Sequence, residues 1–326
     1  GLCLSCVSAS ASTTTQAIPA NTCQEMAADG SPPLDSTSKG KVGRLALVIG
    51  NAAYGGGIAP LRNPARDAAA VTDVLRKLNF TVFVALDARG ATIRDCVLRM
   101  QSALSPDDIA LVYYSGHGIQ IDDRNYIVAT DAEAGGALSD AFVYIDEIID
   151  GVKAKSASIL VFLDACRNNP FAREDAQGLS ASTGRSLARG LAKVDANTPS
   201  ARQEARGIFV AYSTSPNATA SDGEGDLSPF TTAFVTAVKT PGFSVQRALS
   251  EVSRSVGEAT DWSQTPWIKS SLTAEILLNG TMTFEDAQSA SENHAGASKR
   301  LLGRGDVEGA IVEAFRGLPQ SIDDRT

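Results

Sequence analysis

Two short apolar segments constrain the fold of this chain more than any other feature of its sequence. Residues 109–114 and 158–163 are each rich in β-branched or aromatic side chains and bounded by polar residues, a pattern typical of buried strands. The first is followed by Ser115-Gly116-His117-Gly118 and the second by Asp164-Ala165-Cys166-Arg167. If the strands are parallel neighbours, about 5 Å apart, their carboxyl ends bring an imidazole and a thiol into the crevice where open α/β sheets bind ligands.

The remaining elements alternate between strand and helix. Asn63-Pro64 provides a cap residue and a proline at the first helical position, and apolar residues then recur at helical spacing. Further strands are predicted at 45–49, 82–86, 126–130, 207–212 and within 266–277, and further helices at 91–104, 145–152, 229–238 and 245–256. This order predicts an α/β fold, a three-layer α/β/α sandwich with a mostly parallel central sheet.

Composition excludes several function classes. The formal net charge of −8, with no basic stripe, argues against nucleic acid or an anionic membrane surface as partner and suits a basic peptide ligand. No apolar stretch approaches the roughly 20 residues that span a bilayer, so no membrane span is expected. A loop with Gly55-Gly56-Gly57 follows the first strand, but it lacks the glycine spacing of nucleotide-binding loops.

The amino-terminal residues predict an exported protein, periplasmic or secreted, rather than a cytoplasmic one. Residues 1–12 join an apolar piece to small residues with a cleavage-site pattern at 9–11, so we interpret them as the end of a truncated signal peptide. Residues 13–40 lack a periodic apolar pattern and are predicted to be flexible. The whole of 1–41 is thus predicted to be leader and flexible lead-in.

Of the five cysteines, Cys166 has a motif around it. Cys3 and Cys6 form a C-x-x-C without a second ligand pair, so we interpret them as leader rather than as a zinc or redox site. Cys23 lies in the predicted flexible lead-in and Cys96 in a helical pattern.

The following motifs carry a resemblance to a known family: Leu47-Val48-Ile49-Gly50-Asn51, Leu61 through Asn63-Pro64 to Asp67-Ala68, Tyr114-Ser115-Gly116-His117-Gly118, Leu163-Asp164-Ala165-Cys166-Arg167-Asn168-Asn169-Pro170-Phe171, Tyr212-Ser213-Thr214 and Ser228-Pro229-Phe230-Thr231. With them the chain resembles the caspase-like clan of cysteine peptidases, and within it the bacterial metacaspase or orthocaspase group. His117 precedes Cys166 by 49 residues, which matches the caspase spacing, although Asp164 and Asn168 depart from the caspase letters.

The resemblance implies a domain and a catalytic site. We expect a caspase-like peptidase domain over 42–280, with a large part 42–171, a mobile linker 172–206 and a small part 207–280, followed by a helical tail 281–326. Cys166 would be the nucleophile and His117 the acid and base, because the chemistry needs a thiolate and a proton donor for the leaving amine. The backbone N–H groups of Gly118 and Cys166 would form the oxyanion hole.

The resemblance also implies a substrate pocket, in which Asp67 matches the acidic pocket position of metacaspases and Ser115 the pocket serine. With Asp164, two residues before the nucleophile, two carboxylates would favour a guanidinium or ammonium group and hence cleavage after Arg or Lys. The alternative for Asp67 is an exposed carboxylate in the first turn of its helix. Arg62 leaves open an Asp-directed peptidase.

Several further points are left open by the sequence. No cofactor is expected; calcium is undecided, with Asp131, Asp140, Asp146 and Asp175 as candidate ligands but no contiguous calcium loop. The linker carries several Arg residues, so self-cleavage within it is a hypothesis. The competing interpretations are a catalytically restrained caspase-like scaffold, whose tail would contact another protein, and an α/β protein that is not a peptidase.

Overall fold

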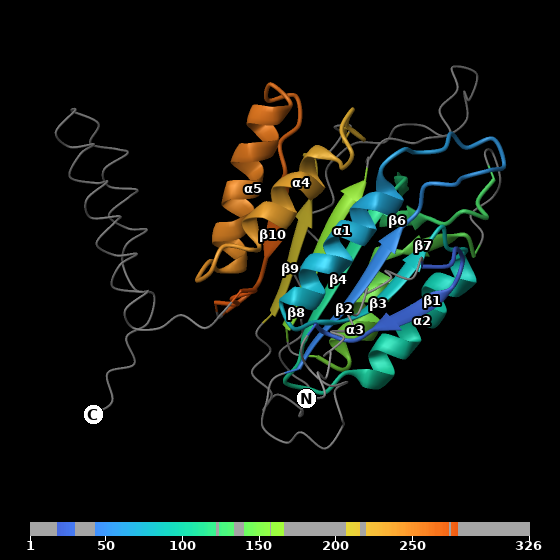
Figure 1. Cartoon of the computed structure of the whole chain (residues 1–326). Helices are drawn as coiled ribbons and strands as arrows, with labels where there is room; N and C mark the ends of the chain where they lie inside the picture. The colour runs from blue at the N-terminus through green and yellow to red at the C-terminus, as the bar shows by residue number, and fades with distance from the viewer. Residues whose placement is uncertain are drawn as a thin grey trace, which may run out of the picture.

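The computed structural model describes residues 18–29, 43–121, 124–133, 140–156, 158–165, 207–215, 220–273 and 275–279. Within them, the core of the molecule is a seven-stranded sheet (Figure 1). In spatial order its strands are β1 (Cys23–Met26), β3 (Thr81–Leu86), β2 (Arg44–Gly50), β4 (Ile109–Gly116), β8 (Ser158–Ala165), β9 (Gly207–Tyr212) and β10 (Trp267–Ser270).

The five inner strands are parallel, and the two edge strands β1 and β10 run antiparallel to their neighbours. The inner strands are nearly continuous apolar runs because both faces of the sheet are covered, and β4 is buried along its whole length. Alternation along β2 divides its side chains between two cores: Leu45 and Leu47 face one, and Ala46 and Val48 face the other.

Helices cover both faces of the sheet, as Figure 1 shows. On one side lie α1 (Pro64–Lys77), α4 (Pro229–Ala237) and α5 (Val245–Ala259), and on the other lie α2 (Gly90–Ala103) and α3 (Ile145–Lys153). Each helix buries an apolar stripe against the sheet. The predicted three-layer α/β/α arrangement with a mostly parallel sheet is therefore confirmed.

A second, smaller sheet follows β4 directly. It consists of β5 (Gly118–Ile121), β6 (Arg124–Val128) and β7 (Phe142–Tyr144), paired antiparallel in that order. The apolar run predicted as a strand at 126–130 is thus a strand in part, but it lies outside the main sheet. Its partners β5 and β7 are too short to give a clear sequence pattern.

The expectation of a flexible lead-in is wrong for residues 18–29. Cys23–Met26 form the edge strand β1, and Cys23 is joined by a disulfide to Cys96 of α2, with 5.5 Å between their Cα atoms. The covalent bond and the pairing of β1 with β3 together fix this segment to the domain.

At the carboxyl end, the predicted last strand is β10, whereas Leu277 makes an isolated bridge with Ser244. Arg44, at the start of β2, donates hydrogen bonds to the carbonyl groups of Leu277 and Leu278 and so ties the two ends of the described domain together. Residues 1–17, the linker 172–206 and the tail 281–326 lie outside the described residues, and the expectations for them stay predictions. None of the described helices is long and apolar enough to cross a membrane.

Candidate active site at the carboxyl ends of β4 and β8

The predicted adjacency of the two motif-bearing strands is confirmed. β4 and β8 are parallel neighbours whose register places Ser115 opposite Asp164 and Gly116 opposite Ala165. His117 is the first residue after β4, and β8 ends at Ala165, directly before Cys166 in the sequence. Cys166 itself lies outside the described residues, so its proposed role is argued from this placement and from the sequence.

The imidazole of His117 lies in a partly buried site formed by the loop that connects β2 to α1. Its Nε2 is 2.8 Å from the carbonyl oxygen of Ala59, and its ring centroid is 4.6 Å from that of Tyr54. A carbonyl oxygen only accepts, so the contact places the proton of the neutral ring on Nε2 and leaves Nδ1 as the basic nitrogen. Burial lowers the pKa of His117, while the Ala59 contact and the charge of Asp222 act in the opposite direction.

Asp67 and Asp164, predicted to act together, are brought together in one buried cluster with Ser115. The Ser115 hydroxyl donates to Asp67 Oδ2 at 3.0 Å, and the Ser228 backbone N–H donates to Asp67 Oδ1 at 2.9 Å. The Ser228 hydroxyl donates to Asp164 Oδ2 and so links the two acids. Asp67 is 0% exposed, so the alternative of an exposed carboxylate in the first turn of α1 is wrong.

The two carboxyl groups titrate near neutral pH. Burial, followed by the negative charge of Asp164, raises the pKa of Asp67 to about 7. Burial also raises the pKa of Asp164 to about 6, against the opposing effect of its hydroxyl donors. Two carboxylates with few counter-charges form a site that a cation would stabilise, because each is costly to keep ionised in a low-dielectric environment.

Ser228 and Thr231 complete this cluster from the start of α4, a role that was not predicted from the sequence. Ser228 is the N-cap: its Oγ accepts from the Thr231 backbone N–H at 2.9 Å, and Pro229 follows at the first helical position. The Thr231 hydroxyl donates to Asp164 Oδ2 at 3.2 Å. The positive end of the helix dipole therefore faces the acids. The Ser-Pro-x-Thr pattern predicts a helix N-cap, but the contact of Ser228 and Thr231 with Asp164 is visible only in the folded structure.

Arg62, the residue that left an acidic specificity open, contacts a different part of the site. Its guanidinium donates to the carbonyl oxygen of Glu224 at 3.1 Å, and its backbone N–H donates to Asp222 Oδ2 at 2.7 Å. Asp222 also accepts from the backbone N–H of Asn63. The loop between β9 and α4 is thus attached to the loop that precedes α1.

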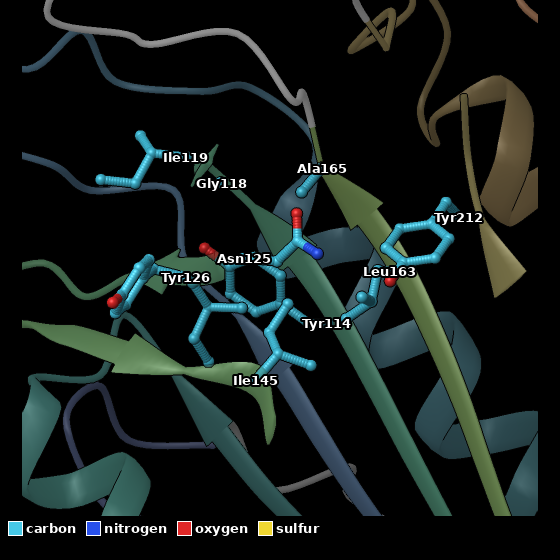
Figure 2. Close-up of a pocket in the computed structure, with 10 residues that line it drawn as sticks. Tyr114, Gly118, Ile119, Asn125, Tyr126, Ile145, Leu163, Ala165 and Tyr212 are labelled. Atoms are coloured by element: carbon cyan, nitrogen blue, oxygen red, sulfur yellow. The ribbon is translucent and has the colours of Figure 1, made fainter. Parts of the chain in front are cut away.

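A pocket, drawn in Figure 2, lies on the side of the sheet to which Tyr114 and Leu163 point. Asp67 comes from α1, on the other side of the sheet. It is small, with a cavity volume of about 20 Å³, and Gly118 and Ala165 contribute to its wall. The rest of the lining is mainly apolar or aromatic and comprises Tyr114, Ile119, Asn125, Tyr126, Ile127, Ile145, Leu163 and Tyr212. Gly118, the predicted oxyanion-hole residue, is the first residue of β5 and is buried.

The described candidate calcium ligands each accept a hydrogen bond within the domain. Asp131 Oδ1 accepts from the backbone N–H of Gly90 at the start of α2, and Asp146 Oδ2 accepts from the Tyr144 hydroxyl. The carbonyl of Asp140 accepts from the Arg94 guanidinium. In the described part of the chain, no three His, Cys, Asp or Glu side chains cluster as a metal site would require. Asp175 lies outside that part.

Two comparisons with known proteins bear on this arrangement. A sequence profile of the caspase domain, the peptidase C14 family, matches residues 43–277. The human protein "Mucosa-associated lymphoid tissue lymphoma translocation protein 1" is 30% identical over 125 residues, a match that covers 38% of this chain and 15% of that protein. The profile match takes in the main sheet from β2 to β10, His117, Cys166 and both acids. The chain belongs to the caspase-domain family of peptidases.

Proposed function

We propose that this protein is a cysteine endopeptidase of the bacterial metacaspase or orthocaspase group, which cleaves peptide bonds after Arg or Lys. One observation carries the proposal: a buried pair of carboxyl groups lies at the same ends of β4 and β8 that lead into His117 and Cys166. Membership of the caspase-domain family supports the peptidase chemistry, and the Asp67–Asp164 pair supports the preference for a basic residue.

The chemistry needs a nucleophile, a proton carrier and amide donors. The Cys166 thiolate would attack the scissile carbonyl carbon, forming a C–S bond and an oxyanion that the N–H groups of Gly118 and Cys166 would stabilise. His117 would protonate the leaving amine, so that the C–N bond breaks and a thioester remains. Water, deprotonated by the imidazole, would then release the carboxylic acid and regenerate the thiol. The Ala59 carbonyl supports this role by keeping Nδ1 free for proton transfer. No cofactor is needed in this scheme.

The substrate side chain would enter between Asp67 and Asp164. A guanidinium can bond to both carboxylates at once, whereas an aspartate side chain would meet two like charges. Ser115 and Ser228 already donate to these acids and would orient them toward the cation. The contact of Arg62 with the 221–226 loop, and not with the acids, supports basic over acidic specificity.

One observation favours a second candidate, a catalytically restrained scaffold. Asp67 is 0% and Asp164 6% exposed, and Ser228 bonds to both of them, so a substrate must open this cluster before its side chain can enter. In a scaffold that opening would not occur, and the tail at 281–326 would serve a protein partner instead.

The deciding experiment uses the full chain and fluorogenic peptides that carry Arg, Lys, Asp or citrulline before the cleaved bond. We expect hydrolysis after Arg and Lys, and a loss on the order of 10³-fold or more in Cys166→Ala and His117→Ala, because the two groups act as a unit. Absence of hydrolysis in a folded wild-type protein would favour the scaffold. Cleavage after Asp would refute the basic pocket.

Two further features of the proposal concern processing and location. The linker 172–206 offers several Arg residues to a pocket of opposite charge, so we propose that the enzyme cuts itself there. The disulfide between Cys23 and Cys96 supports export to the periplasm or beyond, because such bonds are rare in the reducing cytosol.

A further inference from the structure

Two buried tyrosines hold the backbone of His117 from both sides. The hydroxyl of Tyr54 accepts a hydrogen bond from the His117 backbone N–H at 2.9 Å. The hydroxyl of Tyr114 donates to the His117 carbonyl oxygen at 2.5 Å. The two hydroxyl oxygens are 3.2 Å apart, so a closed ring of hydrogen bonds runs from the amide through Tyr54 and Tyr114 to the carbonyl of the same residue.

Each of the three hydrogen bonds in this ring has its own donor proton. The His117 amide gives its proton to Tyr54, Tyr54 gives its own to Tyr114, and Tyr114 gives its own to the His117 carbonyl. Burial raises the pKa of both phenols, so both remain donors across the working pH range. The Val128 carbonyl lies within hydrogen-bond distance of either hydroxyl and offers an alternative acceptor.

The residue before the histidine leaves room for the ring. A Cβ atom at Gly116 would lie 2.5 Å from the Tyr114 hydroxyl oxygen and 2.7 Å from that of Tyr54, closer than Cβ contacts occur in proteins. Glycine is therefore required at this position by the two phenols, in addition to any need for space around a substrate.

Tyr54 also acts on the imidazole itself. Its aromatic ring packs against that of His117 at 4.6 Å, and it belongs to the same loop as Ala59, whose carbonyl binds Nε2. The side chain thus connects the backbone and the ring of His117 to one loop. A small rotation of the imidazole away from Ala59 would remove the contact that opposes the lowering of its pKa by burial.

We infer that Tyr54 is a positioning residue, which sets the orientation of the His117 imidazole for proton transfer, and that Tyr114 assists it. The inference rests on the proposed peptidase function. The two tyrosines do not contribute equally: the His117 carbonyl keeps a second donor, the Val128 backbone N–H at 3.0 Å, when the Tyr114 hydroxyl is lost. The amide that donates to Tyr54 has no such substitute among the described residues. Loss of the Tyr54 hydroxyl therefore has the larger effect.

The test compares Tyr54→Phe, Tyr114→Phe and the matched control Tyr144→Phe in the full chain. Phenylalanine keeps the ring and removes the hydroxyl, and Tyr144 donates to Asp146, outside the hydrogen-bond ring. With an Arg peptide we expect Tyr54→Phe to lower kcat by about 10- to 100-fold with KM within about twofold, since positioning acts mainly on the chemical step. Tyr114→Phe should lose less, and Tyr144→Phe should match wild type.

The pH profile separates positioning from general loosening of the fold. In the pH profile of kcat/KM, one limb reflects the pKa of the His117 imidazole. We expect this limb to move to lower pH in Tyr54→Phe and to stay in place in Tyr144→Phe. A Tyr54→Phe enzyme with wild-type kcat and an unmoved limb overturns the inference, as does a Tyr114→Phe enzyme with the greater loss. If Cys166→Ala and His117→Ala retain activity, it is instead the peptidase proposal that fails. If Tyr54→Phe does not fold, the test rests on Tyr114→Phe. A Tyr114→Phe enzyme with wild-type kcat and an unmoved imidazole limb would then refute a role for the hydrogen-bond ring.

Discussion

The raised pKa values of the acid pair predict how peptide binding depends on pH. The value of about 7 for Asp67 already includes the charge of ionised Asp164, whose own value is about 6, so the pair loses its protons in two steps at these values. Both groups are then ionised in about 0.9 of molecules at pH 8 and in about 0.05 at pH 6. An arginine needs both anions for a bidentate contact. Its association constant should therefore fall by up to about 20-fold, or ~1.8 kcal/mol, from pH 8 to pH 6.

The assay should separate this effect from titration of the catalytic groups. We suggest isothermal titration of the Cys166→Ala protein with an uncleaved Arg peptide at pH 6, 7 and 8, beside the same peptide with citrulline, which is neutral and of similar shape. The Asp67→Asn variant is the matched control, because Asp164 alone would change its ionised fraction by only about twofold over this range.

Two results would refute the reasoning. The first is an Arg peptide that binds equally at pH 6 and pH 8, which would mean that the acids do not meet the guanidinium or are ionised throughout. The second is an equal pH dependence for the citrulline peptide, because no charge on that ligand could then be responsible.

Three further predictions concern the disulfide, the Asp67 carboxyl and the linker. The double substitution Cys23→Ser and Cys96→Ser should lower the free energy of unfolding by up to about 4 kcal/mol, because the unfolded chain is no longer constrained by a loop of 73 residues. An unchanged urea midpoint would contradict this prediction. Asp67→Asn should raise the melting temperature most at pH 8, less near pH 5 and not below about pH 4, because the pKa of this carboxyl rises from 3.8 to about 7 on folding and wild-type stability therefore falls as the pH rises between these values. Incubated wild type should be cut after Arg or Lys within 172–206, whereas Cys166→Ala should remain intact; fragment mass and terminal sequencing check this.

The sequence was sufficient to predict the parts of the fold that depend on continuous apolar runs. β4 and β8 are buried on both faces, so their composition alone identifies them, and their parallel pairing follows from the alternation of strands and helices. The clustering of Asp67 with Asp164 was predicted from the family resemblance, since the two are far apart in the sequence and come from a helix and a strand.

Other features depend on contacts that no local pattern encodes. β1 reads Cys-Gln-Glu-Met, without alternation, and becomes a strand because the edge of β3 and the bond to Cys96 hold it there. The link from Ser228 to Asp67 spans 161 residues, and the ring through Tyr54 and Tyr114 exists only once the β2–α1 loop folds over the end of β4. These contacts arise from the tertiary structure, and their residues look ordinary in the sequence.

The composite origin of the acid cluster suggests how the chain could be divided into two separately encoded polypeptides. Asp67, Ser115 and Asp164 precede the linker 172–206, whereas Ser228 and Thr231 follow it. The pairing of β8 with β9 and the contacts of Asp222 with Arg62 and Asn63 also join the two sides. Neither polypeptide would contain a finished pocket, so selectivity for a basic residue would appear only on complementation and would report the association of the two pieces.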